Sequence, residues 1–282
     1  MKKLVERLLI FFIGLPLIIA SVLFLPQYHY LVLHIEILFF SVIAILEMRT
    51  ILSHKLPVLS VPLSIILGLI IPVASFIYAV FGLSFHIIEL SIATAAFFIF
   101  CIEFIFSLKG KFADSISRIA SSFTLVMYPG YFFMFVSRMC VHPNASALLT
   151  NFLLMVFGCD SIAWVIGMLF GKNNRGVIPA SPNKSIAGFI GGYIGAIIAG
   201  IFSYVVFPDV FGTSIIKTFI LALLTATAAI IGDIIESVFK RSAGVKDSGT
   251  VIPGRGGVLD SIDSILLAAP AYYIFCYFFI GH

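Results

Sequence analysis

Charged residues are scarce in this chain. Only 11% of its 282 residues are Asp, Glu, Lys or Arg, whereas about a quarter of a soluble domain is charged. Hydrophobic residues make up 61%, and they gather in runs of roughly 20 residues, the length that crosses about 30 Å of hydrocarbon. The low charge and the long apolar runs leave no room for a sizeable soluble domain, and they predict a polytopic membrane protein.

Paired cysteines and alternating strand patterns are also absent. No two of the four cysteines form a Cys-x-x-Cys pair, so the sequence indicates neither a zinc site nor a disulfide framework. The apolar runs are too long for barrel strands and do not alternate. Because a backbone in lipid must satisfy its own hydrogen bonds, we expect an all-α transmembrane helical bundle.

Nine apolar segments are long enough to span a membrane. The first resembles the apolar region of a signal peptide, but it is longer and no small-x-small cleavage site follows, so we interpret it as an uncleaved span. The nine predicted spans are Leu8–Leu25, Leu31–Ile51, Leu59–Phe81, Phe85–Ser107, Ile116–Ser137, Ala147–Phe170, Ile186–Phe207, Ser214–Phe239 and Leu259–Ile280.

The basic residues predict the orientation of these spans. With the N-terminus in the cytoplasm, fifteen of the seventeen Lys and Arg residues fall on the cytoplasmic side, and only Arg138 and Lys217 lie outside. The net charge of +4 therefore reflects membrane topology, and we expect no nucleic-acid partner. Outside loops such as Pro208–Thr213 are short. The long inside loops, 171–185 and 240–258, are rich in Gly, Pro and polar residues, as functional loops on a rigid scaffold often are.

Acidic residues stand inside or at the ends of several spans, where charge is costly. Asp160 lies about 15 Å into its helix. The spacing of three places Asp233 with Glu236, and Asp260 with Asp263, on common helix faces near the cytoplasmic ends. We expect these four to converge beside the basic loop, and carboxylates with phosphate oxygens are the usual magnesium environment. The alternative is interfacial charges paired with Lys240, Arg241 or Lys246.

Four further glutamates, Glu36, Glu47, Glu89 and Glu103, are isolated in the early spans with no motif around them. We expect packing, snorkelling or local hydrogen bonds to hold them.

The segment from Ser237 to Asp263 combines features suited to phosphate chemistry. It carries Lys and Arg side chains, and Gly254, Gly256 and Gly257 allow backbone N–H groups to approach an anion closely. Aspartates follow at once. A cationic loop beside carboxylates suits phosphoryl or nucleotidyl transfer, where positioning and charge neutralisation do most of the work.

This segment resembles the signature of phosphatidate cytidylyltransferases (CDP-diacylglycerol synthases), which reads Ser-x-x-Lys-Arg, four residues, Lys-Asp-x-Gly, then Pro-Gly-His-Gly-Gly and Asp-Arg-x-Asp. The chain matches it at Ser237, Lys240, Arg241, Lys246, Asp247, Gly249, Pro253, Gly254, Gly256, Gly257, Asp260 and Asp263. Residues 160–167, 170–172 and 181–188 are similar to the family's Asp-x-x-Ala-Tyr-x-x-Gly and Ser-Pro-x-Lys-Ser-x-x-Gly elements. The resemblance covers the last half of the chain. We therefore divide the chain into N-terminal helices (1–140, about five spans) and a catalytic part (141–282).

Two positions of the segment from Ser237 to Asp263 depart from the family pattern. Arg255 replaces the family's His, and Ser261 replaces the Arg between the two aspartates. Arg255 can hold phosphate but cannot accept a proton near neutral pH. The local charge stays similar, because one cation is lost and another gained. A catalytically silent homologue is left open.

The resemblance implies an enzyme that joins CTP to phosphatidate, releases pyrophosphate and uses Mg²⁺, alone or with a second cation. It implies Asp233, Asp260 and Asp263 as metal ligands, with Asp247 and Lys246 also in the catalytic set. It further implies a homodimer and a site facing the cytoplasm, which we place at a bacterial inner (plasma) membrane. The residues expected to bind substrate or phosphate are Lys184, Ser185, Lys240, Arg241, Arg255, Gly256, Gly257 and Asp160.

Two other functions fit parts of the pattern. A CTP-dependent polyprenol or phytol kinase would transfer the γ-phosphate of CTP to a lipid. An ion-coupled transporter would use the intramembrane acidic residues as a relay.

Overall fold

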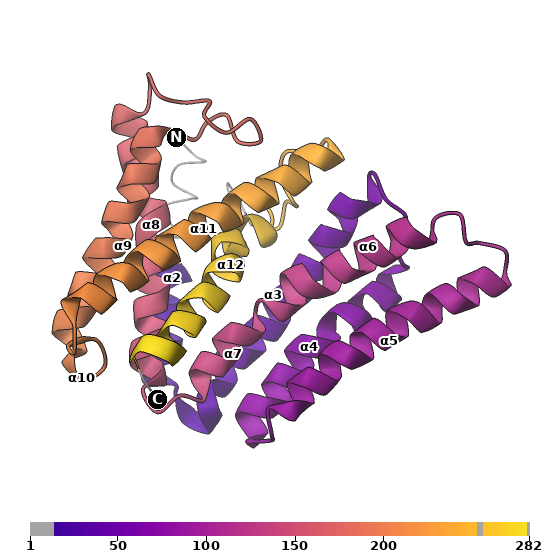
Figure 1. Cartoon of the computed structure of the whole chain (residues 1–282), viewed down its shortest axis with the longest axis horizontal. Coiled ribbons are helices and arrows are strands. Elements are labelled where there is room, and N and C mark those ends of the chain that lie inside the picture. Colours follow the sequence, from indigo (N-terminus) through magenta and orange to yellow (C-terminus); the bar gives the residue numbers. More distant parts are fainter. Residues whose placement is uncertain (1–13, 253–255, 281–282) are drawn as a thin grey trace. The chain divides into compact units, whose positions relative to one another are not determined.

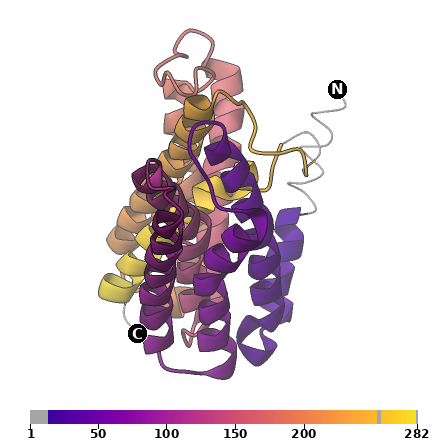
Figure 2. The same ribbon diagram turned by 90° about the vertical axis from the view of Figure 1, so that its right-hand side faces the viewer.

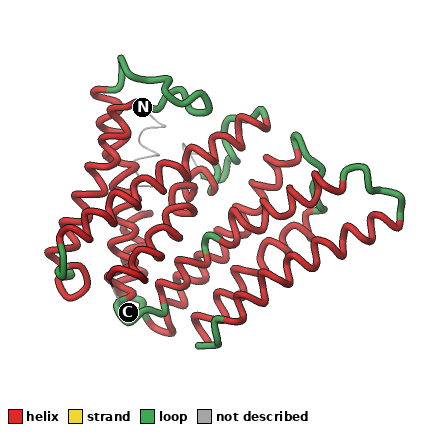
Figure 3. Tube along the Cα trace, in the orientation of Figure 1, coloured by secondary structure: helices red, strands yellow, loops and turns green. Residues whose placement is uncertain are grey.

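The regular secondary structure is helical throughout the described part of the chain (Figure 1 and Figure 3). The computed structural model describes residues 14–252 and 256–280, and in these ranges it contains no strand, only two isolated bridges. The helices are α2 (Leu15–Phe24), α3 (Gln27–Ser53), α4 (Val61–Phe81), α5 (His86–Leu108), α6 (Ser115–Val126), α7 (Met134–Cys140), α8 (Ala145–Phe170), α9 (Ile186–Val206), α10 (Pro208–Phe211), α11 (Ile215–Ala243) and α12 (Leu259–Phe275), with π-helical turns η2 (Met127–Tyr131) and η3 (Cys276–Ile280).

Eight segments within the described residues are long and apolar enough to cross a membrane, which confirms an integral membrane protein of the all-α class. They are α3, α4, α5, the α6–α7 segment, α8, α9, α11 and α12 with η3, and they match the last eight predicted spans. The predicted span Leu8–Leu25 lies partly outside the described residues, and its described part forms α2. The short helix α10 lies within the predicted loop Pro208–Thr213.

The chain forms two compact units. Unit 1 comprises residues 1–138 and 239–261, and unit 2 comprises residues 139–238 and 262–282. The helices α11 and α12 therefore each have one part in unit 1 and the other part in unit 2. The sequence-based division at residue 140 stays a prediction, because it concerns function rather than compactness.

In unit 1, the helices α3, α4 and α5 pack side by side, and α6 with η2 packs against α4 (Figure 2). Small residues allow the close approach. A Cβ atom at Gly68 would lie 2.7 Å from Ile45 of α3, and one at Gly130 of η2 would lie 2.9 Å from the Gly68 carbonyl. Pro129 lacks a backbone N–H, and the π-helical turn η2 forms at this residue.

In unit 2, the helices α8 and α9 pack through facing glycines. A Cβ atom at Gly158 would lie 3.2 Å from the carbonyl of Gly195, so small residues bring the two backbones close together. A buried hydrogen-bond chain joins α8 to α12: the Asn151 amide donates to the Tyr272 hydroxyl (3.0 Å), and that hydroxyl donates to the Leu148 carbonyl (3.0 Å). These two hydrogen bonds connect α12 to α8 at a point C-terminal to Asp263.

The α8–α9 contact yields a stability prediction. In Gly195→Ala, the new methyl would overlap the Gly158 backbone, which no rotamer change relieves. We expect a loss of about 1–3 kcal/mol, visible as a lower thermal unfolding temperature in detergent. The control is Ile198→Ala on the same helix, where the side chain is 56% exposed and we expect a smaller change. Equal unfolding temperatures for Gly195→Ala and the wild type would contradict this packing.

Candidate functional site

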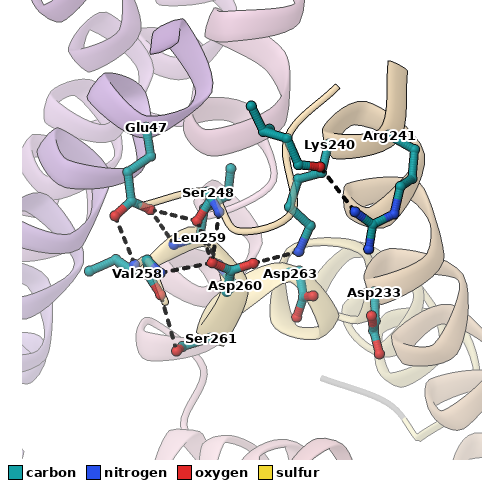
Figure 4. Close-up of polar contacts among 12 residues, drawn as sticks. Glu47, Asp233, Lys240, Arg241, Ser248, Val258, Leu259, Asp260, Ser261 and Asp263 are labelled. Atoms are coloured by element: carbon teal, nitrogen blue, oxygen red, sulfur yellow. Dashed lines mark hydrogen bonds and ion pairs between the residues drawn. The ribbon is translucent and has the colours of Figure 1, made fainter. Parts of the chain in front are cut away.

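The signature loop (residues 244–258) joins α11 to α12, and in unit 1 its described residues, 244–252 and 256–258, include Ser248 and Gly257, which bind the carboxylate of Asp260 (Figure 4). The Asp260 Oδ2 atom accepts the backbone N–H of Gly257 (2.7 Å) and the N–H of Ser248 (2.9 Å), and it lies 2.8 Å from the Ser248 hydroxyl. Lys240, in the last turn of α11, places its Nζ atom 2.5 Å from Asp260 Oδ1. Asp260 is therefore both the anchor of the loop and the partner of a lysine.

Glycines give this loop its path. Gly256 has φ +115°, a conformation that L side chains rarely adopt. It exchanges two backbone hydrogen bonds with Ile252 (2.8 and 3.0 Å). A Cβ atom at Gly256 would lie 2.5 Å from Asp260 Oδ2, and one at Gly257 would overlap the Ser248 hydroxyl. These two glycines make room for side chains of the protein itself, whereas their predicted contact with phosphate stays a prediction.

Glu47 of α3 is part of the same arrangement, although no sequence motif surrounds it. Its side chain is buried, and it accepts the N–H of Val258 (3.0 Å) and that of Leu259 (2.7 Å). The Ser248 hydroxyl lies 3.1 Å from its Oε2 atom (Figure 4). The expectation of packing or local hydrogen bonds is wrong here, because these partners are 201 to 212 residues away in sequence.

The other three isolated glutamates also have partners, but only the partner of Glu89 lies in the same helical turn, whereas those of Glu36 and Glu103 lie 15 residues away on an adjacent helix. Glu36 lies 3.5 Å from the Ser21 hydroxyl, and Glu89 pairs with His86 at 2.8 Å. Glu103 accepts two hydrogen bonds from the Arg118 guanidinium, at 2.5 and 2.8 Å. A charged residue near the end of a span signals that a partner exists, but only the fold shows which partner it is.

The remaining predicted residues of the signature segment differ in exposure. Arg241 is exposed, and its guanidinium donates to the Val245 carbonyl at 3.1 Å. Lys246 and Asp247 are exposed, and their side chains make no hydrogen bond or ion pair with the part of the chain that the structure describes. Arg255 lies outside the described residues. Ser261 donates to the Gly257 carbonyl at 3.4 Å.

Unit 2 holds a second group of predicted residues. Lys184, just before α9, lies 2.5 Å from Asp233 of α11. Gly232 allows close approach of α12, since a Cβ atom there would overlap the Asp263 carbonyl. Asp263 is buried, and it lies close enough to Asp160, Asp233 and Glu236 to be repelled by their charges. These acidic residues thus gather around one buried aspartate.

Two of the predicted binding residues have structural contacts in unit 2. Ser185 is the N-cap of α9: its buried hydroxyl accepts the N–H of Gly188 at 3.0 Å. Asp160 of α8 accepts the Ser264 hydroxyl at 3.2 Å. Their expected roles toward phosphate, a lysine or a lipid headgroup stay predictions.

The donor chemistry of both groups suits a hard divalent cation. Among the described residues, no three His, Cys, Asp or Glu side chains are arranged to ligate one ion. Magnesium, however, often uses only one or two carboxylates together with waters and substrate phosphates. Asp233 and Asp260 each already bind one cationic group, a lysine ammonium. A metal ion bound to either aspartate would therefore take the place of a lysine, in unit 2 or unit 1 respectively.

The fold and these side chains define a polytopic α-helical membrane protein in which two aspartates, Asp233 and Asp260, are each paired with a lysine. The sequence model of the cytidylyltransferase family matches residues 5–279. Because this match covers nearly the whole chain, the protein belongs to the cytidylyltransferase family.

Individual relatives are similar over part of the chain. It is 43% identical over 136 residues to a phosphatidate cytidylyltransferase of Haemophilus influenzae, covering 47% of this chain and 46% of that protein. It is 40% identical over 147 residues to a phosphatidate cytidylyltransferase of Thermotoga maritima, covering 51% and 52%. An uncharacterized protein of Escherichia coli, YnbB, is 37% identical over 135 residues, covering 47% and 43%. The chain spans about half the length of the curated relatives it matches.

The loop glycines yield a second prediction. Gly244 and Gly256 both have positive φ, +76° and +115°, but a Cβ atom meets nothing within 4 Å at Gly244. Gly244→Ala should therefore lower the free energy of unfolding only by the strain of placing an L residue at positive φ, about 1–2 kcal/mol. Gly256→Ala should lower the free energy of unfolding by this strain and by about 1–3 kcal/mol more, because its methyl group would clash with the Asp260 carboxylate. Thermal unfolding in detergent measures both, and equal losses would contradict the contact with Asp260.

Proposed function

We propose that the protein is a phosphatidate cytidylyltransferase, which joins CTP to phosphatidate to give CDP-diacylglycerol and pyrophosphate. Family membership and the names of the similar bacterial proteins support the proposal. The observation that carries it is the Lys240–Asp260 contact at the signature loop. This contact would supply a lysine for a phosphate oxygen and a carboxylate for a metal ion, side by side at the part of the loop that binds Asp260.

The reaction needs charge neutralisation more than proton transfer. A phosphatidate phosphate oxygen, already anionic, attacks the α-phosphorus of CTP, and the bond to the β-phosphate breaks as pyrophosphate leaves. No strong general base is required for an anionic nucleophile. Arg255, in the place of the family's His, is therefore compatible with the reaction. It adds positive charge, and although it cannot accept a proton, this step does not require a proton acceptor.

The lysines and arginines hold the phosphates. Lys240 would exchange Asp260 for a phosphate oxygen, and Lys184 would do the same from Asp233. Arg241 and Lys246 are exposed and would meet the nucleotide as it arrives, with Arg255 and Asp247 in the same loop. Preorganised cations of this kind stabilise the charge that develops in the transition state.

Asp233, Asp260 and Asp263 are the proposed magnesium ligands. A magnesium ion, alone or with a second cation, would use one or two of these carboxylates together with waters and phosphate oxygens, and when bound it would neutralise charge on the phosphates of CTP. The buried Asp263, surrounded by acidic groups, would be stabilised by any positive charge brought close to it. Asp160 would orient Lys184 or the lipid headgroup.

The proposed site faces the cytoplasm of a bacterium, from the inner (plasma) membrane. The distribution of basic residues supports this orientation, and the similar relatives named above are bacterial. CTP would arrive from the water, whereas phosphatidate would stay in the leaflet with its phosphate at headgroup level. A homodimer remains the expectation from the family resemblance.

Labelled CTP tests the reaction. Purified protein with phosphatidate, Mg²⁺ and CTP labelled in the cytidine should give a labelled lipid, and pyrophosphate should appear in equal amount. Chelation by EDTA should stop the reaction and added Mg²⁺ should restore it. Label from the γ-phosphate in the lipid, without cytidine, would identify a lipid kinase instead. If no labelled lipid forms although phosphatidate is confirmed to be mixed with the protein, the chain is a catalytically silent homologue. The double variant Arg255→His, Ser261→Arg would then test whether these two positions cause the loss of activity.

A variant of Lys240 tests its role in holding phosphate. Lys240→Gln removes the cation that contacts Asp260, and we expect kcat/KM for CTP to fall about 100-fold or more, the usual effect of removing one preorganised donor. Lys109→Gln, an exposed residue of the loop after α5, is the control and should leave kcat/KM within about twofold. Similar values for both variants would exclude a role of Lys240 in catalysis.

A further inference from the structure

We propose that Glu47 is the positioning residue of the signature loop: from the N-terminal half of the chain, it holds the start of α12 and thereby the carboxylate of Asp260. The consequence for catalysis rests on the proposed function. The anchoring itself rests on contacts within unit 1.

Glu47 satisfies backbone groups that a helix leaves unpaired. The first N–H groups of a helix have no partner within it, and a negative charge beside them is favourable. At the start of α12, the N–H of Val258 donates to Glu47 Oε1 at 3.0 Å and that of Leu259 donates to Oε2 at 2.7 Å. Glu47 is only 6% exposed, so water does not replace these bonds easily.

The neighbouring N–H groups bind the other partners of the same arrangement. Gly257 donates to Asp260 Oδ2 at 2.7 Å, and the N–H of Asp260 donates to the Ser248 hydroxyl at 3.3 Å. Four consecutive N–H groups, 257 to 260, are therefore bound by Asp260, Glu47 and Ser248 (Figure 4). A shift of Glu47 would rotate the peptide units that hold Asp260.

Ser248 connects the two carboxylates directly. Its hydroxyl lies 2.8 Å from Asp260 Oδ2 and 3.1 Å from Glu47 Oε2. A hydroxyl has a single proton to donate, so it is shared between the two acceptors. Through this link the position of Glu47 determines the orientation of Asp260, whose other oxygen contacts Lys240.

Two glycines of the signature fit Glu47 sterically. A Cβ atom at Gly249 would lie 2.5 Å from Glu47 Oε1, and one at Gly257 would overlap Oε2. These glycines leave the space that the glutamate occupies. The signature loop is thus shaped to receive a side chain of α3, which lies outside the motifs that identify the family.

The isosteric change Glu47→Gln tests the anchoring. The amide keeps the size of the side chain, but it presents one acceptor oxygen and an NH₂ group where three donors now converge, so at least one of them loses its partner. Hydrogen exchange of the full-length protein in detergent should become about tenfold faster in peptides covering residues 244–262. Peptides from α8 and α9 should exchange as in the wild type.

The same variant tests positioning through kinetics. With Asp260 displaced, kcat for cytidylyl transfer should fall about tenfold or more, whereas KM for phosphatidate should change less than about threefold, because the lipid-facing helices are unchanged. Glu36→Gln is the matched control: it is an equally isosteric change on the same helix, it alters only the contact with Ser21, and it should leave both exchange and kcat unchanged.

Ser248→Ala provides a second variant that keeps the bonds from Glu47 to α12 and removes the link to Asp260. It should lower kcat with a smaller effect on exchange, and it carries the test if Glu47→Gln does not fold. Unchanged exchange at 244–262 in both variants, or faster exchange spread equally over α8 and α9, would overturn the anchoring. Faster exchange at 244–262 with unchanged kcat would overturn positioning. A wild type that makes no CDP-diacylglycerol would refute the proposed function, while the exchange result would still decide the anchoring.

Discussion

A charge within a membrane-spanning helix must find a partner, and this requirement organises the polar contacts of both units. In unit 1, Arg118 pairs with Glu103, and Asp260 pairs with Lys240 while it accepts bonds from the loop. In unit 2, Asp233 pairs with Lys184. Burying one of these groups alone would cost several kcal/mol. Removing one partner of a pair would therefore destabilise the local fold, and in the proposed function the pairs of Asp260 and Asp233 would each supply a cation and a carboxylate.

The lysine–aspartate contacts explain how one set of residues serves both stability and the proposed reaction. In the absence of substrate the lysine neutralises the aspartate. A nucleotide with its metal ion carries both charges that the pair would lose on separation: phosphate for Lys240 and a cation for Asp260. In the proposed reaction this exchange would keep every charge compensated, and no buried ion would be left without a partner.

The helices could be predicted from the sequence because their signal is local. A run of apolar residues of membrane length specifies a span whatever its neighbours are, and eight predicted spans match the described helices to within a few residues. Asp260 and Asp263 could also be selected as candidate site residues from the sequence, because they follow a glycine-rich loop. The π-helical turn at Pro129 and the short helix α10 were not predicted, because neither changes the apolar run around it.

The partners of the charges could not be predicted, because they depend on contacts between distant segments. Glu47 binds groups more than 200 residues away, and no spacing rule connects them. Gly256 and Gly257 were predicted to admit an anion, and the anions that they admit in the structure are Asp260 and Glu47. Only the fold shows that the protein itself supplies two carboxylates to this loop, and the predicted contact of the loop with phosphate stays a prediction.

The most direct test of this account is an experimental structure with CTP and Mg²⁺ bound. We expect the Lys240 Nζ atom to leave Asp260 Oδ1 and to contact a phosphate oxygen, while Glu47 keeps its bonds to Val258 and Leu259. A nucleotide bound elsewhere, with Lys240 still on Asp260, would contradict the central claim that this pair is exchanged for the phosphate and the metal ion.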